Sequence, residues 1–375
     1  MNHRLVSPFG LRELTFRNRI AISPMQQFMA GQDGIPTDWH RVHLGQFAFG
    51  GAGVVFTEAM AVEPRGRISY GDMGLWNEQQ ALALRSLTAL IRSAGAVPGI
   101  QISHAGRRGA INRPWEGKRP LTAADAGHGE PPWALWSSSA LASRPEAQRP
   151  EAMTQSMIEH VQAAYVRTAQ LADQAGFEVL ELHGGHGYMI HSFLSPLSNN
   201  RGDDYGGSLA NRMRFALEVV ERVRDVWPAG KPLYFRVSAI DGVAGGWDMS
   251  DTLVLVRELM QRGVDVIDVS SGGLSGLSSN ASAHARTPGY HVQMSSEIRR
   301  ATGAITQVVG LITDAHQAAD IVTKGDADLV AVGREALRNP YWPSHVAETL
   351  GATDFGSWPP SYAWWLRARR EHLES

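Results

Sequence analysis

The chain of 375 residues contains no cysteine. This absence excludes disulfide bonds, thiolate-bound zinc, iron–sulfur clusters held by cysteine and thiol nucleophiles. Any redox chemistry that the protein performs must therefore come from an organic cofactor.

An excess of charge of either sign is also missing, because 35 lysines and arginines face 37 aspartates and glutamates. This balance argues against a nucleic-acid partner and favours a small-molecule substrate. Long hydrophobic runs are absent too. None approaches the roughly 20 residues that a membrane span needs, and residues 1–8 lack the apolar core of a signal peptide. We therefore expect a soluble, cytoplasmic protein with neither a membrane nor a nucleic-acid partner.

What the sequence does contain is a regular alternation of short apolar runs with longer segments of helical period, which predicts repeated βα units. Eight runs have the character of buried strands: residues 20–23, 54–57, 97–102, 178–182, 233–237, 264–269, 306–309 and 328–332. Two intervening segments, 154–175 and 209–227, carry the one-sided apolar stripe of a helix that covers a sheet.

Eight such units predict an α/β fold of the (β/α)8 TIM-barrel type. Single barrels commonly run from about 250 to more than 400 residues, so residues 1–375 fit one domain. A doubly wound open sheet is the alternative, although no G-x-G-x-x-G turn follows the first run.

Residues 107–150, after the third run, interrupt this alternation with six prolines and no sustained period. A long insertion after the C-terminal end of a barrel strand usually covers the active site. Trp115, Trp133 and Trp136 give the segment side chains with which to pack. We predict a long loop or small subdomain that caps the site, with a disordered surface loop as the alternative.

The most informative motif is HGGHGY at residues 183–188, directly after the fourth run. Two imidazoles three residues apart on a tight turn can converge on one ligand oxygen, and the phenol of Tyr188 can reach a neighbouring atom as a proton donor. We predict His183, His186 and Tyr188 as catalytic residues. The competing interpretations are a pair of structural histidines in a polar loop and half of a metal site. The turn offers no third ligand, so we expect no metal.

The other candidate residues follow or end the predicted strands, since a barrel carries its active site at the C-terminal ends of its strands. They are Ser23, Pro24, Met25, Gln26, Ala59, Gln101, Arg236, Gly310, Gly333 and Arg334. Residues after the seventh and eighth strands commonly hold a phosphate, so Gly310, Gly333 and Arg334 are predicted to do so. A surface salt bridge is the alternative role for Arg334. Arg236 lies in an apolar strand and needs an anion or a polar ring edge, or else an ion pair with Asp241 or Asp268.

Six motifs in this order resemble the old yellow enzyme family, and most of all its short bacterial branch with the xenobiotic reductases. They are SPM at 23–25, GIQISHAGR at 99–107, HGGHGY at 183–188, FLSPLSN at 193–199, DYGGSLANR at 204–212 and VGRE at 332–335. The resemblance runs from about residue 8 to residue 370.

The resemblance implies a (β/α)8 barrel that binds FMN tightly but non-covalently and uses NADPH or NADH to reduce it. Hydride then passes from flavin N5 to the β-carbon of an electron-poor alkene, such as an enone, maleimide, nitroalkene or quinone. His183 and His186 would bind the substrate oxygen, and Tyr188 would protonate the α-carbon. Gln101, Ala59 and Arg236 would contact the flavin ring, residues 23–26 would line its other edge, and Gly333 and Arg334 would hold its phosphate.

Two positions depart from the family pattern. Gln26 stands where this branch usually has a cysteine, and Phe28 where it usually has a tyrosine that helps to bind substrate. A phenyl ring can stack but cannot donate a hydrogen bond, so we expect Phe28 to favour apolar ligands.

The tail, residues 357–375, resembles the segment that in relatives enters an active site of the same or a neighbouring subunit. It contains Trp364, Trp365 and several arginines, and such residues are enriched at interfaces. We expect a homodimer or higher homo-oligomer with Trp365 near substrate, and an amphipathic helix packed on the barrel is the alternative. The alternative functions are a flavin dehydrogenase or desaturase that runs oxidatively, and a quinone or NAD(P)H oxidase with weak alkene reduction.

Overall fold

A computed structural model describes residues 3–274 and 287–374. Its centre is a closed barrel of eight parallel strands, which confirms the predicted (β/α)8 architecture and shows that the doubly wound alternative is wrong. The strands are β3 (Ile20–Ile22), β4 (Val54–Ala61), β5 (Val97–Ser103), β8 (Val179–Gly184), β9 (Leu233–Ser238), β10 (Val266–Ser270), β11 (Ile305–Val308) and β12 (Leu329–Val332). Each of the eight predicted runs overlaps one strand. The largest difference is in β4, which continues beyond Thr57 because its register with β5 shifts between Phe56 and Ala59.

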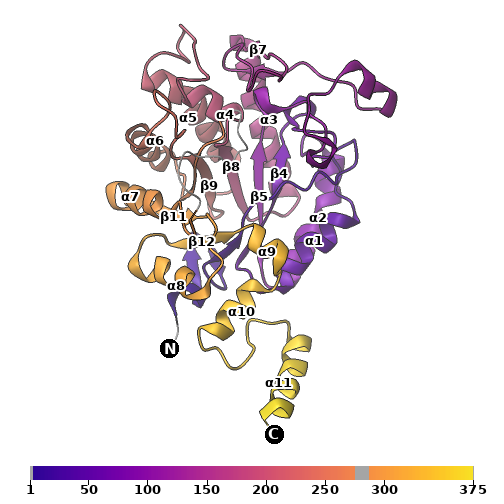
Figure 1. Cartoon of the computed structure of the whole chain (residues 1–375), viewed down its shortest axis with the longest axis vertical. Helices are drawn as coiled ribbons and strands as arrows, with labels where there is room; N and C mark the ends of the chain where they lie inside the picture. The colour runs from indigo at the N-terminus through magenta and orange to yellow at the C-terminus, as the bar shows by residue number, and fades with distance from the viewer. Residues whose placement is uncertain (1–2, 275–286, 375) are drawn as a thin grey trace.

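Helices surround the barrel (Figure 1). The main ones are α1 (Asp38–Phe49), α2 (Glu78–Ser93), α3 (Gln155–Gln174), α5 (Leu209–Val226), α6 (Met249–Gln261), α7 (Val292–Thr302), α8 (Ala315–Lys324) and α10 (Trp342–Thr349). Two short helices, α4 (Met189–Leu194) and α9 (Arg334–Arg338), follow β8 and β12 directly at the C-terminal ends of these strands. No helix within the described ranges is both long and apolar enough to cross a membrane.

The predicted helices begin and end where their sequences provide caps. At the start of α3 the hydroxyl of Thr154 accepts a hydrogen bond from the backbone N–H of Met157, and after its end Gly176 takes a positive φ of 86°. Helix α5 begins after Ser208, whose side chain accepts from Asn211 N–H, and ends just before Pro228.

A β-hairpin that the sequence analysis did not predict closes the N-terminal end of the barrel. It consists of β1 (Phe9–Leu11) and β2 (Leu14–Phe16), which pair antiparallel. Leu11 and Phe16 pack in one apolar cluster with the first residues of four barrel strands: Val54, Val179, Val266 and Leu329. The hairpin therefore seals the end of the barrel opposite the predicted active site.

The insertion lies between β5 and α3 and is folded rather than disordered. It contains three short 3-10 helices at Gly106–Arg108, Pro114–Glu116 and Ala123–His128, and two short strands, β6 (Trp136–Ser137) and β7 (Glu151–Ala152), that pair with each other. The hydroxyl of Ser138 donates to the carbonyl of Ser192 in α4 at 2.7 Å. The predicted insertion after the third barrel strand is therefore confirmed.

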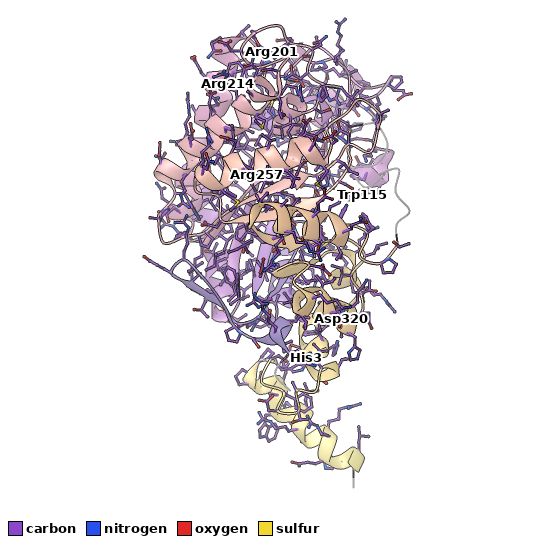
Figure 2. All side chains as sticks on the ribbon, turned by 90° about the vertical axis from the view of Figure 1, so that its left-hand side faces the viewer. His3, Trp115, Arg201, Arg214, Arg257 and Asp320 are labelled. Carbon is purple, nitrogen blue, oxygen red and sulfur yellow. The ribbon has the colours of Figure 1, made fainter. Side chains whose placement is uncertain are left out.

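The tail ends in α11 (Pro360–Glu374), which projects from the barrel beyond α10 in both views (Figures 1 and 2). It lies at the opposite end of the molecule from the insertion (Figure 1). Trp364 and Trp365 are 60% and 67% exposed. Helix α11 is thus not packed along the barrel.

Candidate active site

A cavity of about 510 Å³ opens at the C-terminal end of the barrel. Twelve of the residues predicted from the sequence line it: Pro24, Met25, Gln26, Ala59, Gln101, His183, His186, Tyr188, Arg236, Gly310, Gly333 and Arg334. Ser23 lies behind them, where its hydroxyl accepts a hydrogen bond from the Arg236 guanidinium at 3.1 Å. The strand ends of the barrel therefore bring residues from almost the whole chain to one cavity.

The turn after β8 presents the two histidines and the tyrosine. His183 lies in the strand, whereas His186 and Gly187 take positive φ values of 58° and 74° before α4 begins. Such left-handed conformations are uncommon for a residue with a side chain. The Ser238 hydroxyl accepts from the His186 backbone N–H at 2.9 Å, and Arg108 of the insertion donates to the His186 carbonyl at 2.8 Å. Neighbouring elements thus hold the strained turn in place.

Both imidazoles are neutral at physiological pH. Burial, supported by the positive charges of Arg236 and Arg108, holds the pKa of His183 and of His186 well below the usual range. The Gly185 backbone N–H donates to His183 Nδ1 at 3.3 Å, so the ring proton of His183 is on Nε2. His183 Nε2 lies 3.2 Å from His186 Nδ1 and donates to it, which leaves the His186 proton on Nε2. The pair therefore offers N–H donors without carrying charge.

Tyr188 completes the turn. Its ring meets the His183 ring edge-on, with centroids 5.1 Å apart. Burial raises the pKa of its phenol above the ordinary value, although nearby Arg108 partly opposes this. The side chain is therefore a protonated phenol, which can donate a proton.

A buried polar chain crosses the base of the cavity. Gln101 donates to Glu181 at 2.7 Å, and Arg236 lies 3.4 Å from Asp268, so one of the predicted ion pairs of Arg236 is present. Burial raises the pKa of both Glu181 and Asp268, and the charge of Asp268 adds to the effect on Glu181, whereas Arg236 opposes the shift of both carboxyls. Within the described residues, Arg236 Nε has no hydrogen-bond partner. Arg236 thus keeps a donor for a ligand.

The end of the cavity near β11 and β12 suits an anion. Gly310, with a φ of 147°, follows β11, and Gly333 and Arg334 follow β12. Arg334 is exposed on the cavity wall and forms no ion pair within the part of the chain that the structure describes, so the salt-bridge alternative has no support there. Arg338 lines the same wall one turn later.

Gln26 lines the cavity, and two buried acidic side chains, Asp72 and Glu58, lie behind the loop that carries it. Burial raises the pKa of Asp72 to about 7, against the opposing effects of the Ile68 backbone N–H at 2.5 Å and the facing Gln26 amide. Burial and the charge of Asp72 raise the pKa of Glu58 well above its usual range. Glu58 accepts from the Gln27 backbone N–H at 2.9 Å. The loop that carries Gln26 is thus held by two buried carboxyls, Glu58 and Asp72, whose pKa is raised by burial.

Two predicted substrate residues lie apart from this cavity. Phe28, with a φ of 57°, is half-buried against Trp115 of the insertion, with ring centroids 6.1 Å apart. Trp365 lies on the projecting helix α11. Neither is among the residues that line the cavity of its own chain.

Sequence reasoning missed part of the cavity wall: Ser270, Tyr290, His291, Leu311, Ile312, Thr313 and Arg338. Ser270 ends β10, so the rule of strand ends could have found it. Arg338 could have been found from its spacing of four residues after Arg334 on one helix. Tyr290 and His291 follow no strand directly, and no local signal pointed to them.

Comparisons with known proteins identify the family of the chain. Residues 4–352 match the model of the NADH:flavin oxidoreductase / NADH oxidase family. The chain is 40% identical to an NADPH dehydrogenase of Listeria welshimeri over 362 residues, which cover 96% of this chain and 99% of that protein. It is also 40% identical to an NADPH dehydrogenase of Geobacillus sp. strain WCH70 over 355 residues, or 94% and 96% of the two chains.

Solved structures show the same fold. Morphinone reductase has a TM-score of 0.77 at 24% identity and covers 94% of this chain and 91% of its own. A complex of 2-naphthoyl-CoA reductase has a TM-score of 0.82 at 24% identity, but the match spans 92% of this chain and only 52% of that one. From the family match and the NADPH dehydrogenase relatives together, we conclude that the chain belongs to the NADH:flavin oxidoreductase / NADH oxidase family, that of the old yellow enzymes, and is an NAD(P)H-dependent flavin oxidoreductase.

Proposed function

We propose that the protein is an FMN-dependent ene-reductase that reduces electron-poor alkenes at the expense of NADPH or NADH. The observation that carries this proposal is the turn at 183–188. Two neutral imidazoles and a protonated phenol lie together in one cavity, which is an arrangement for binding an oxygen and protonating an atom near it.

The residues around the cavity fit FMN. Arg334, which has no ion-pair partner among the described residues, provides a cation for the phosphate beside Gly310 and Gly333. Arg236 keeps an unpartnered Nε, and its positive charge suits a ring that gains negative charge on reduction. Gln101 is held by Glu181 at the cavity wall. When bound, FMN supplies the two-electron chemistry, taking hydride from NAD(P)H and passing hydride to the β-carbon of an enone, maleimide, nitroalkene or quinone.

His183 and His186 bind and polarise the oxygen of the alkene substrate. The Nε2–H that His183 donates to His186 can turn to a substrate oxygen, and His186 has a second N–H on Nε2. Negative charge grows on that oxygen as the alkene is reduced, so donors fixed beside it stabilise the transition state. Neutral imidazoles suit this role, because they donate hydrogen bonds without drawing in a counter-ion.

Tyr188 donates the proton that completes the reduction at the α-carbon. Its raised pKa keeps the phenol protonated at neutral pH, and Arg108, 5.6 Å from its ring centroid, stabilises the phenolate that forms. The proton is replaced from solvent before the next turnover.

The test is a two-step anaerobic experiment on the purified protein, which should be yellow. NADPH is added until the flavin absorbance bleaches, and 2-cyclohexenone or N-methylmaleimide is then added. We expect the oxidised spectrum to return with formation of the saturated product. In Tyr188→Phe, reoxidation by the alkene should be slower by about 100-fold or more, since general acids contribute roughly 10²–10⁴, while reduction by NADPH should change little.

Tyr70→Phe is the matched control. The Tyr70 hydroxyl donates a hydrogen bond to the Pro131 carbonyl, and Tyr70 is not among the residues that line the cavity. Equal rates for Tyr188→Phe and Tyr70→Phe would contradict the role of Tyr188. A wild-type flavin that reduces but is reoxidised only by dioxygen or quinones would replace the ene-reductase with the alternative, an oxidase with weak alkene reduction.

We further predict a cytoplasmic location and a homodimer or higher homo-oligomer. The exposed Trp364 and Trp365 on α11 support an interface, because large apolar side chains on a projecting helix need a partner surface. In such an oligomer Trp365 would approach the substrate site of a neighbouring subunit. Light scattering of the purified protein, with and without residues 357–375, tests this prediction.

A further inference from the structure

A second, smaller cavity lies within the insertion, and its lining is strongly basic. Arg107, Arg108, Lys118 and Arg144 line it, together with the polar side chains of Ser143 and Gln148. We call this cluster of four cations the basic pocket. Its volume of 30 Å³ is about twice what one water molecule requires, so it has room for a compact group and not for a ring.

The positive charge of the basic pocket is not balanced by the protein. Within residues 3–274 and 287–374, Arg107, Arg108 and Lys118 have no carboxylate within ion-pair distance, and Arg144 meets only Glu146, at 4.0 Å. The Glu146 side chain is 75% exposed, so it is largely solvated. The sequence of residues 275–286 contains no aspartate or glutamate. Four neighbouring cations with only one distant, exposed carboxylate are costly to place together, unless an anion joins them.

Burial increases the free-energy cost of this uncompensated positive charge. Arg107 is only 4% exposed, and burial together with the charge of Arg108 lowers its pKa to about 10. The hydrogen bonds of Arg107 go to backbone carbonyls at 3.4 Å or more, and its Nε has no partner among the described residues. The negative charge of Asp241 partly opposes this lowering of the Arg107 pKa. However, Asp241 already accepts a hydrogen bond from the Ser195 hydroxyl at 2.6 Å and lies 3.1 Å from His191.

The basic pocket shares a wall with the active site. Arg108 lines the pocket, yet it also donates to the carbonyls of His186 and Gly273 and lies over the Tyr188 ring. On the other side, Arg144 donates to the carbonyl of Lys118 at 2.6 Å and holds Lys118 in a left-handed conformation with a φ of 55°. Arg108 therefore connects the basic pocket to the turn that carries His186 and Tyr188.

We propose that the basic pocket binds a phosphate group of the nicotinamide coenzyme. This inference rests on the proposed function, because the coenzyme must enter the active-site cavity to reduce the flavin. Every NADH or NADPH molecule carries a diphosphate, and NADPH carries a further 2′-phosphate. A phosphate is compact and multiply charged, and it matches a small cavity with an arginine fork on each side.

The test uses substitutions at the rim of the pocket, since Arg107 and Arg108 also bind backbone carbonyls and their loss could disturb folding. In Arg144→Ala and Lys118→Met holoenzymes, flavin reduction is followed anaerobically at increasing NADPH or NADH. We expect the dissociation constant of the coenzyme to rise about 10-fold in each variant, as for one lost charge-assisted hydrogen bond, and the limiting reduction rate to stay within about 2-fold. Arg144→Lys should recover part of the affinity.

Arg149→Ala is the matched control, because Arg149 is an exposed arginine of the same insertion that does not line the pocket. This variant should change neither the dissociation constant nor the limiting reduction rate.

The two coenzymes identify which phosphate is bound. A loss confined to NADPH places the 2′-phosphate in the pocket, and an equal loss with both coenzymes places the diphosphate there. Calorimetry with adenosine 2′,5′-bisphosphate and with ADP gives the same answer without catalysis. Unchanged constants for both coenzymes in both variants would overturn the proposal, and so would weaker binding of a carboxylate-bearing enone with coenzyme binding intact.

A further experiment distinguishes failure of this phosphate-binding proposal from failure of the proposed ene-reductase activity. Flavin reduced with dithionite needs no coenzyme, so its reoxidation by a neutral enone reports the alkene activity alone. Variants of the basic pocket should reoxidise at the wild-type rate in that experiment.

Discussion

At the N-terminal end of the barrel, Leu11 and Phe16 meet the apolar first residues of the strands, whereas at the C-terminal end the strands finish in His183, Arg236 and Gly333. The first end is closed by a hairpin and dry. The second carries neutral imidazoles, the guanidiniums of Arg236 and Arg334, and buried carboxyls with a raised pKa. Both ends are made by the same eight strands, so the difference arises from the residues at the strand termini and not from the fold.

The two ends of the barrel therefore make opposite contributions to the stability of the folded protein. Burial of apolar side chains at the sealed end stabilises the barrel. At the open end, buried groups such as Arg236 and Asp72 are kept although they cost free energy without a ligand. Substitutions at the two ends should therefore act on different measurable quantities.

The largest effect is expected at the sealed end. Phe16 is fully buried, so Phe16→Ala should lower the free energy of unfolding by about 3–5 kcal/mol, as large core truncations do. Urea unfolding of the holoenzyme, followed by tryptophan fluorescence, measures this. Phe28→Ala at the open end should cost less than about 2 kcal/mol, and the flavin spectrum of folded Phe16→Ala should match wild type. Equal losses from the two variants would remove the contrast between the ends.

The next effect concerns the buried acid behind Gln26. The folded-state pKa of Asp72 is raised from 3.8 to about 7, so its protonated form favours folding. That stability is fully present below pH 3.8 and is lost as pH rises to about 7, by on the order of 4 kcal/mol. Asp72→Asn should flatten this part of the profile and be the more stable protein at pH 8. Asp320→Asn, at an exposed i,i+4 pair with Lys324, is the control and should leave the profile unchanged. Equal slopes for wild type and Asp72→Asn over this window would contradict the raised pKa.

The smallest effect is expected at Phe28, which lies against Trp115 near the open end. Phe28→Tyr adds a hydroxyl that can donate to a polar substrate oxygen. We expect the affinity for polar enones to rise by about 3- to 10-fold relative to apolar ones, the value of one neutral hydrogen bond. Steady-state KM values across a matched series of enones measure the ratio, and an unchanged ratio would exclude Phe28 from substrate binding.

The barrel and most of the cavity could be predicted from the sequence because both depend on short-range signals. The apolar runs located eight strands, and the rule that residues after them share one mouth placed Gln101, Arg236 and Arg334 on a common wall. The caps at Thr154 and Gly176 likewise fixed the ends of α3 to within a residue.

The remainder depended on contacts between distant segments. The strands of the hairpin are only three residues long, too short for a periodic signal, and their apolar faces are explained only by the barrel end that they cover. The basic pocket combines Arg107 and Arg108 after β5 with Lys118 and Arg144 from further along the insertion. No spacing in the sequence indicates that these charges meet.

The hairpin also has a consequence for the order in which the chain folds during synthesis. Glu13 N–H donates to the Gly230 carbonyl, and Arg12 binds Asp265, 253 residues further along the chain. At translation rates of about 5–20 residues per second, Arg12 waits roughly 10–50 seconds for this partner to be made. The hairpin thus leaves the ribosome well before the segments that it contacts. In the meantime the apolar side chains of Leu11 and Phe16 lack the partners that bury them in the folded protein.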